Sequence, residues 1–167
     1  MIANHEDTLF FESGSTVEDQ SISLGYWINA QATYGIPSRA NTFLLNTTET
    51  QGPYRLWNQD AFDHPWLSSF PLYGAVPYLM GHAATQTASI AWMNSAETWV
   101  DIFDSVNQKN EGSGMYTSFT SQGGVLDFWL LGAASGPKAV STQLSIMSGF
   151  APMPSVNSLG FHFCKWE

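Results

Sequence analysis

A chain of 167 residues, 44% of them hydrophobic, can bury one sizeable core and is too short for two comfortable domains. Five Lys and Arg against fourteen Asp and Glu give a net charge of −9, and the sequence has no basic cluster to neutralise phosphates, so nucleic acid is not an expected partner. Only 11% of the residues are charged and 14% are aromatic, and this mixture, with frequent glycine and proline, favours strands joined by turns.

No apolar run approaches the ~20 residues of a membrane-spanning helix, so a membrane is not an expected partner either. The opening MIANHEDTLFFES lacks the basic start and apolar stretch of a secretory signal, and the sequence by itself therefore assigns no compartment. A single cysteine, Cys164, excludes an internal disulfide and a zinc site built from several thiolates. No motif in the sequence indicates a cofactor.

In chain order, residues 1–20 are a polar leader apart from the segment TLFF, and we expect residues 11–20 to form a turn or loop. From residue 21 to residue 136, short apolar or alternating runs recur between Gly, Pro, Asn and Ser. This spacing predicts a mainly β domain, an antiparallel β-sandwich. The runs are residues 21–30, 32–45, 53–58, 76–83, 89–96, 98–103 and 114–132.

The segment GGVLDFWLLG at residues 123–132 is largely apolar on both faces of a strand. The positions on one face are Val125, Asp127, Trp129 and Leu131, and those on the other are Leu126, Phe128 and Leu130. A strand that is apolar on both sides is typical of the interior of a protein, so we expect an interior strand here.

Residues 137–149 carry the pattern of one short helix. Pro137 suits its first turn, and Val140, Leu144 and Met147 recur at i, i+4 and i+7 as an apolar stripe. Gly149 is placed to end it.

Residues 150–167 form a linker marked by prolines, followed by the start of an apolar strand. A strand of this kind needs a pairing partner, which the sequence does not supply after it. We therefore expect the sequence to be part of a longer protein.

Six segments, in this order, resemble glycoside hydrolase family 31. They are TYGIPSRANTFLL, PYRLWNQDAF, PLYGAVPYLMGH, WMNSAETWVDI, GGVLDFWLLG and SLGFHFCKWE. Together they extend the resemblance over roughly residues 20 to 167, and several co-linear blocks are far more specific than one motif. Within the family, the blocks resemble the group formed by the glucosidase II α-subunit and the neutral α-glucosidases.

The resemblance implies a galactose-mutarotase-like β-sandwich, a linking helix and the truncated first strand of a (β/α) barrel. Retaining glycosidases use two carboxyl groups about 5 Å apart, one as nucleophile and one as acid/base. In the family both come from the barrel, and the nucleophile motif Trp-x-Asp-Met-Asn-Glu does not occur in this sequence. The resemblance thus implies a retaining α-glucosidase whose catalytic residues lie elsewhere, and a fragment that is inactive alone.

The resemblance also implies a substrate-binding loop. In related enzymes, the loop after the Tyr-Arg-Leu-aromatic-Asn block leans over the barrel mouth and contributes an acid to sugar recognition, and the matching residue here is Asp60. A carboxylate suits that task because it can accept two hydroxyl hydrogen bonds at once. Phe62 and His64 follow, and a flat ring there could stack against a sugar. We expect residues 71–82 to be sandwich core.

The partners that the resemblance implies are an α-glucoside or glucosylated N-glycan as substrate and the catalytic barrel of the same polypeptide. If the parent is like glucosidase II, a separate β-subunit and the endoplasmic reticulum lumen are implied as well. The triplet NTT at Asn46 is a formal N-glycosylation acceptor, which matters only if the chain enters the secretory route.

Other candidate sites have plainer explanations. Glu97 and Asp101 would lie some ~13 Å apart on a strand, too far for a retaining pair, so we expect structural acids. His162 and Cys164 would share a strand face, but a metal needs a further ligand, and we expect Cys164 to be packed and inert. Ser113 lacks the G-x-S-x-G pattern of a hydrolase nucleophile and is expected to lie in a loop.

Five tryptophans are candidates for the core because large aromatic side chains supply much of a small sandwich's buried area. They are Trp57, Trp66, Trp92, Trp99 and Trp129. Trp57 and Trp66 flank the Asp60 loop, and for these two a core role and a ligand platform both stay open. An alternative function follows, a non-catalytic carbohydrate-binding module in which Trp57, Trp66 and Phe62 stack against a sugar. The segment SLGFHFCKWE favours the enzyme, because a binding module has no use for it.

Overall fold

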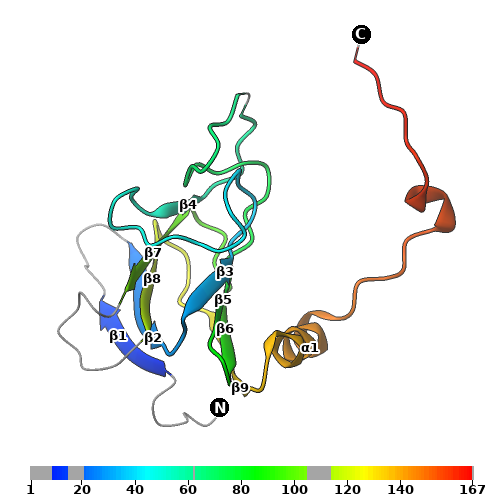
Figure 1. Cartoon of the computed structure of the whole chain (residues 1–167). Helices are drawn as coiled ribbons and strands as arrows, with labels where there is room; N and C mark the ends of the chain where they lie inside the picture. Colours follow the sequence, from blue (N-terminus) through cyan, green and yellow to red (C-terminus); the bar gives the residue numbers. More distant parts are fainter. Residues whose placement is uncertain (1–8, 15–20, 62, 105–113, 167) are drawn as a thin grey trace.

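The structure is a computed structural model that describes residues 9–14, 21–61, 63–104 and 114–166. Its strands form two antiparallel sheets that face each other, and a helix follows them on the outside of the second sheet (Figure 1). The predicted mainly β architecture with one short helix near the C-terminal end is therefore confirmed. The described residues form no closed barrel.

The first sheet has five strands in the order β1-β2-β8-β7-β4, and all neighbouring strands are antiparallel. They are β1 (Leu9–Gly14), β2 (Ile22–Ile28), β8 (Met115–Ser121), β7 (Thr98–Asp104) and β4 (Tyr54–Leu56). The second sheet has four strands in the order β3-β5-β6-β9, again antiparallel. They are β3 (Ala32–Gly35), β5 (Tyr78–His82), β6 (Thr87–Trp92) and β9 (Phe128–Ala134).

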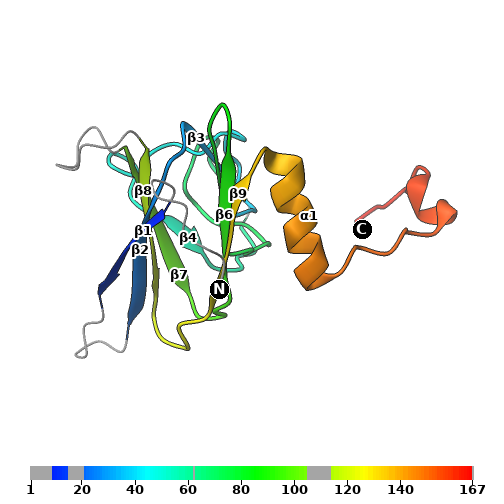
Figure 2. The ribbon, with the colours of Figure 1, turned by 90° about the horizontal axis from the view of Figure 1, so that it is seen from below.

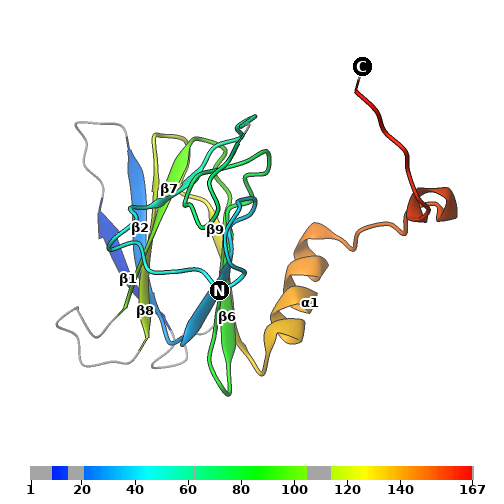
Figure 3. The same ribbon diagram turned by 45° about the horizontal axis from the view of Figure 1, so that its top comes forward.

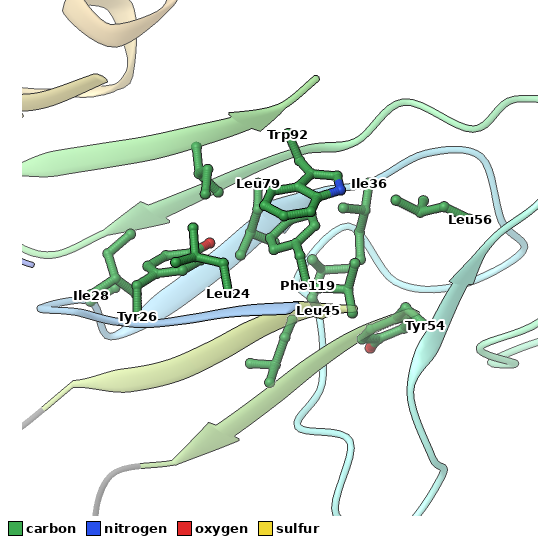
Figure 4. Packing of buried hydrophobic residues seen from close by; sticks show 14 of the residues in the cluster. Leu24, Tyr26, Ile28, Ile36, Leu45, Tyr54, Leu56, Leu79, Trp92 and Phe119 are labelled. Atoms are coloured by element: carbon green, nitrogen blue, oxygen red, sulfur yellow. The ribbon is translucent and has the colours of Figure 1, made fainter. Parts of the chain in front are cut away.

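The core lies between the two sheets, and its side chains come from alternate positions along the strands. In β7, every second residue from Thr98 to Ile102 is buried and the residues between are partly exposed, which is the period of a strand with one face on a core. Figure 4 shows the rings of Trp92 and Phe119 stacked at its centre, with centroids 5.7 Å apart. Since Trp92 belongs to β6 and Phe119 to β8, this contact joins the sheets.

The close approach of the sheets depends on Gly81 of β5. A Cβ atom at this position would lie 2.4 Å from Ile28 Cδ1 and 2.9 Å from Ala30 Cβ, and both of these neighbours are buried. Any side chain at this position would therefore require the Ile28 side chain and Ala30 to shift.

β6 is buried along its whole length because one face packs on the core and α1 (Pro137–Ser148) covers the other. Figure 2 shows α1 alongside β6 and β9. As predicted, the helix begins at its proline and ends before Gly149, whose φ of 80° suits glycine. Val140 is fully buried against Leu131, whereas Met147 is exposed. The apolar stripe is thus buried only in the first part of the helix.

β1 differs from the expectation for the leader. Residues 9–14 pair with β2, from Leu9 opposite Ile28 to Gly14 opposite Ser23. The predicted loop is therefore wrong for residues 11–14. A segment with a weak strand pattern can still form a strand when it pairs with the edge of a sheet, because the hydrogen bonds to the neighbouring strand determine its conformation.

β9 was expected to be an interior strand, and this prediction is wrong for the described residues. It lies at the edge of the four-stranded sheet and pairs there with β6. Its two apolar faces have another cause. Phe128 and Leu130 pack against the core, Leu131 lies beneath Val140 of α1, and Trp129 is 49% exposed.

Residues 150–166 follow α1 as an extended segment with one short 3-10 helix, η2 (Val156–Leu159), and are exposed throughout. Figure 1 and Figure 3 show this segment leading away from the sandwich. It contains no strand, so the truncated first barrel strand stays a prediction about a longer chain. Cys164 is exposed, and its expected packing is wrong for this structure.

Candidate functional site

The connection between β4 and β5 carries the predicted site residues, and hydrogen bonds between its two arms hold it in shape. The backbone N–H of Gln59 donates to the Leu72 carbonyl at 2.8 Å, and the Asn58 side-chain amide donates to the Tyr73 carbonyl at 2.5 Å. We call residues 58–73 the projecting loop, and Figure 1 shows it extending beyond β4. The bonds close it at its base.

The returning arm of the projecting loop also orients the carboxylate of Asp60. The Tyr73 hydroxyl donates a hydrogen bond to Asp60 Oδ1. Both side chains are exposed, Tyr73 to 67%. The pKa of Tyr73 is raised by this hydrogen bond and by the negative charge of Asp60, because both favour the protonated phenol. The carboxylate can still accept further hydrogen bonds, since two oxygens offer several acceptor positions.

Arg39 anchors the projecting loop from outside. Its Nη1 donates to the Ser69 carbonyl at 2.8 Å, while Nε and Nη2 donate to the Ile36 carbonyl at 3.0 and 2.7 Å. The guanidinium lies over the ring of Tyr54, 5.0 Å from its centroid. Burial lowers the pKa of Arg39 to about 10, which leaves it charged at neutral pH. Its hydrogen bonds to backbone carbonyls make it a structural clamp.

Sequence reasoning assigned no role to Arg39. The sequence did offer one signal for such a role. Basic residues are rare in this chain, five in all, and Arg39 stands in the turn-rich segment IPSRAN, where an arginine can bind backbone carbonyls. Two backbone bonds strengthen the same attachment, from Leu67 to the Ala40 carbonyl at 2.8 Å and from Ser38 to the Gly74 carbonyl at 2.7 Å. Residues 36–40 are thus the platform on which the projecting loop is fixed.

A hollow of about 380 Å³ opens beside the base of the projecting loop, and Trp57, Asn58 and Glu97 are among the residues that line it. Arg55 forms an ion pair with Glu97, and its guanidinium lies 5.3 Å from the centroid of the Trp57 ring. The hollow has the size of a small-molecule pocket, and its wall combines an aromatic ring with amide and carboxylate groups.

The structure brings together only part of the predicted substrate-binding set. Asp60 and His64 both lie exposed on the projecting loop. Phe62 lies outside the described residues. Asp60 is fixed by Tyr73, and the described residues give His64 no comparable hydrogen bond.

Residues 71–82, which contain the end of the projecting loop, are not sandwich core throughout, contrary to the prediction from sequence. Within residues 71–82, Leu79 is fully buried, but Tyr73 and Val76 are 67% and 49% exposed. The prediction is therefore wrong for Tyr73, which belongs to the candidate site, and for Val76, which follows the projecting loop, whereas Pro71 is buried as expected.

The tryptophans divide in the same way. Trp92 is fully buried, which confirms a core role for it, and Trp99 is partly buried. Trp57, Trp66 and Trp129 are 47%, 71% and 49% exposed, so the core interpretation is wrong for these three. Trp57 stands before the projecting loop and Trp66 within it, and both rings are partly accessible to other molecules, although the guanidinium of Arg55 lies over the ring of Trp57.

The two acids with the spacing of a candidate carboxylate pair are structural, as expected. Glu97 accepts a hydrogen bond from Arg55, and Asp101 Oδ1 accepts one from the Thr48 hydroxyl at 3.0 Å. In the part of the chain that the structure describes, no cluster of three or more His, Cys, Asp or Glu could hold a metal ion. The same residues contain no helix long and apolar enough to cross a membrane. Ser113 lies outside them.

The family described as "Glycosyl hydrolase 31 N-terminal galactose mutarotase-like domain" matches residues 2–101. The chain belongs to this family. The matched region includes Asp60 and the whole projecting loop, so the candidate site lies within the part that defines the family 31 domain. The galactose-mutarotase-like sandwich predicted from sequence is confirmed.

Relatives with similar sequences have α-glucosidase names. Neutral alpha-glucosidase AB of Dictyostelium discoideum is 33% identical over 146 residues, which cover 84% of this chain and 15% of that protein. The protein of the same name from Sus scrofa is 35% identical over 149 residues, covering 80% and 16%. The probable glucan 1,3-alpha-glucosidase of Arabidopsis thaliana is 32% identical over 163 residues, covering 89% and 18%. The chain therefore spans less than a fifth of the length of these relatives.

Solved structures of glucosidase II contain a similarly folded region. The glucosidase II α-subunit in its alpha3-Glc2-bound form superposes with a TM-score of 0.68 at 30% identity, covering 75% of this chain and 15% of that one. The catalytic subunit of a heterodimeric ER glucosidase II complex, solved with the binding domain of its regulatory subunit, gives a TM-score of 0.67 at 30% identity, covering 75% and 15%.

Proposed function

We propose that this chain is the amino-terminal sandwich of a retaining α-glucosidase and that it contributes Asp60 to recognition of a terminal α-linked glucose. The observation that carries the proposal is the geometry of Asp60, an exposed carboxylate on a loop closed at its base and oriented by Tyr73. Membership of family 31 and the α-glucosidase names of the relatives support the reaction class. Phe62 and His64 would add contacts from the same loop.

In this proposal the catalytic pair lies in a barrel of the same polypeptide outside these residues. A retaining enzyme needs two carboxyl groups about 5 Å apart. Glu97 and Asp101 are already bound by Arg55 and Thr48, which leaves neither available as half of a pair. The 167 residues alone would therefore not hydrolyse a glucoside.

Apolar residues near α1 support docking of such a barrel. Trp129 on β9, Ile146 on α1 and Phe150 just after the helix are 49%, 73% and 75% exposed. Large apolar surfaces are rarely left bare on monomers, so we propose that the barrel covers this side of the second sheet. If the parent resembles the ER complex, a β-subunit and the lumen of the endoplasmic reticulum belong to the same proposal, with a glucosylated N-glycan as substrate.

The proposal is tested by hydrolysis of a chromogenic α-glucoside. We expect no turnover by the purified chain and clear turnover by a full-length protein that contains it. In the full-length protein, Asp60→Ala should lower kcat/KM about 10–100-fold, because it removes hydrogen bonds to a charged group. Asp63→Asn, a change of a second exposed acid on the same loop, is the matched control and should stay within about twofold.

Two results would count against it. Enzyme-specific turnover by the chain alone would show that the catalytic pair is present within it. An unchanged kcat/KM in Asp60→Ala would remove Asp60 from substrate recognition.

The exposure of Trp57 and Trp66 favours a second candidate function, a non-catalytic carbohydrate-binding module. Exposed rings offer flat apolar surfaces that sugars can cover. Calorimetric titration of the chain with an α-linked glucose disaccharide should then show binding that Trp66→Ala weakens, with no activity in the full-length protein. Binding that survives the loss of both rings would contradict this function.

A further inference from the structure

The NTT triplet lies in the loop between β3 and β4, and its two key residues have opposite environments. Asn46 is exposed, whereas Thr48 is only 4% exposed. The Thr48 hydroxyl donates to Asp101 at 3.0 Å and accepts from the Ile102 N–H at 3.0 Å, and the Thr48 N–H donates to the Ile102 carbonyl at 2.8 Å. Thr48 thus pairs with the edge of β7 beyond the end of β4.

Asn46, by contrast, is held through its backbone alone. Its N–H donates to the Tyr54 hydroxyl at 2.9 Å, and its carbonyl accepts from the same hydroxyl at 3.0 Å. Its side-chain amide makes no hydrogen bond with the described part of the chain. The fold therefore fixes the backbone of Asn46 and leaves the amide in solvent.

We propose that Asn46 is the acceptor of an N-linked glycan that is attached before Thr48 docks on β7. The proposal rests on the proposed function in one respect, which is entry of the chain into the lumen of the endoplasmic reticulum. An Asn-x-Thr triplet is the acceptor pattern, and Asn46 is the only asparagine in the sequence that begins an Asn-x-Ser/Thr triplet.

The donor in this reaction is an oligosaccharide linked to a lipid diphosphate. The Asn46 amide nitrogen forms a bond to C1 of the first sugar, and the bond between C1 and the diphosphate oxygen breaks. The lipid diphosphate leaves with the bonding electrons, and the amide gives up one proton. No oxidant or reductant is required.

The order of events follows from where the partners of Thr48 lie in the chain. Asp101 and Ile102 are 53 and 54 residues further along. A chain that enters the lumen from its N-terminus exposes the triplet before β7 is available to pair with it. Once β7 forms, the hydroxyl of Thr48 is buried and bonded, and a transferase can no longer extend the triplet in its site.

The folded protein can accommodate the glycan. Phe43 and Leu44, close by in the same loop, are 84% and 48% exposed, and a solubilising glycan would shield them from other molecules. The triplet pairs with the edge of the first sheet, whereas α1 lies outside the second sheet (Figure 1). A glycan on Asn46 therefore leaves the apolar surface near α1 uncovered.

The test is translation of the 167-residue chain, with a secretory signal appended, in the presence and absence of microsomes from the endoplasmic reticulum. We expect one mobility shift that requires microsomes and that N-glycosidase removes. Asn46→Gln should abolish the shift, and Thr47→Ala, which changes only the middle residue of the triplet, should keep it. An unshifted wild-type chain, or a shift that persists in Asn46→Gln, would overturn the proposal.

The order of events has its own assay. A synthetic peptide of residues 41–53 and the folded chain are each given to detergent-solubilised oligosaccharyltransferase with its lipid-linked donor. The peptide should be modified at least about tenfold faster, and equal rates would overturn the claim that docking of Thr48 closes the site. Both assays need no α-glucosidase activity, so an inactive full-length protein would overturn the proposed function and leave these results standing.

Discussion

The hydroxyl of Tyr73 donates a hydrogen bond to the carboxylate of Asp60 across 13 residues of the projecting loop. Two further bonds, from Gln59 and Asn58 to residues 72–73, join the same two arms. The acid is therefore oriented before a ligand arrives. Preorganisation of this kind lowers the ordering cost that binding would otherwise carry.

Tyr73→Phe in the full-length protein should raise KM for an α-glucoside about 2–5-fold and change kcat less, because it removes one hydrogen bond that orients a binding group. Initial rates over a range of substrate concentrations measure both constants. Val76→Ala, which alters another exposed side chain just after the same arm, should leave KM within about twofold. A fall in kcat with KM unchanged would contradict a positioning role for Tyr73.

The sandwich could be predicted because its strong strands carry their own pattern. β7 alternates with a period of two, and α1 shows Pro137, a buried Val140 and Gly149 at the positions that begin, pack and end a helix. β1 and β9 could not be placed in the same way. β1 is placed by pairing with β2, the next strand along the chain, and β9 by pairing with β6, which is distant in sequence. The pattern within a strand does not report which strand it pairs with.

The site shows the same limit. Asp60 could be named because it stands in a block of residues that resembles a family. Arg39 and Tyr73 could not, because their roles come from contacts 30 and 13 residues away that exist only once the loop has its path. The sequence also could not predict whether Trp57 and Trp66 are buried or exposed, since a large aromatic ring suits a core and a binding surface equally well.

The ion pair between Arg55 and Glu97 should contribute about 1 kcal/mol of coupling to the stability of the chain. The side chain of Glu97 is 6% exposed and that of Arg55 is 41% exposed. The pair is therefore intermediate between fully exposed ion pairs, which contribute little stability, and fully buried ones, which are costly to break. Urea unfolding of Arg55→Ala, Glu97→Gln and the double variant gives the coupling free energy. If the two single effects simply add, the pair contributes nothing.

Val140→Ala should lower the free energy of unfolding by about 1–2 kcal/mol, since Val140 is fully buried between α1 and Leu131 and its loss leaves a cavity. Hydrogen exchange of α1 amides should accelerate more than that of β7. Ile146→Ala on the same helix is the control, because Ile146 is 73% exposed and its change should cost less than about 0.5 kcal/mol. Equal effects of the two variants would show that α1 is not held through Val140.

The stability of the chain should fall as the pH rises above 10 because of Tyr26. Burial raises the pKa of its phenol well above the ordinary value of 10.0. The unfolded chain therefore loses this proton near pH 10 while the folded chain keeps it, so the folded state binds more protons and unfolding becomes more favourable with each further rise in pH.

Urea unfolding between pH 8 and pH 11.5 checks this prediction. The wild-type free energy of unfolding should fall by up to about 1.4 kcal/mol per pH unit above 10 from this group. Tyr26→Phe keeps the buried ring and removes the titrating hydroxyl, so it should flatten the slope there and change the stability at pH 7 much less. Other groups titrate in the same pH range. The raised pKa values of Tyr54 and Tyr73 add to the fall in stability, whereas the lowered pKa of Arg39, about 10, opposes it, so the slope of Tyr26→Phe is the balance of these three groups. An undiminished slope in Tyr26→Phe would mean that other groups control the alkaline unfolding.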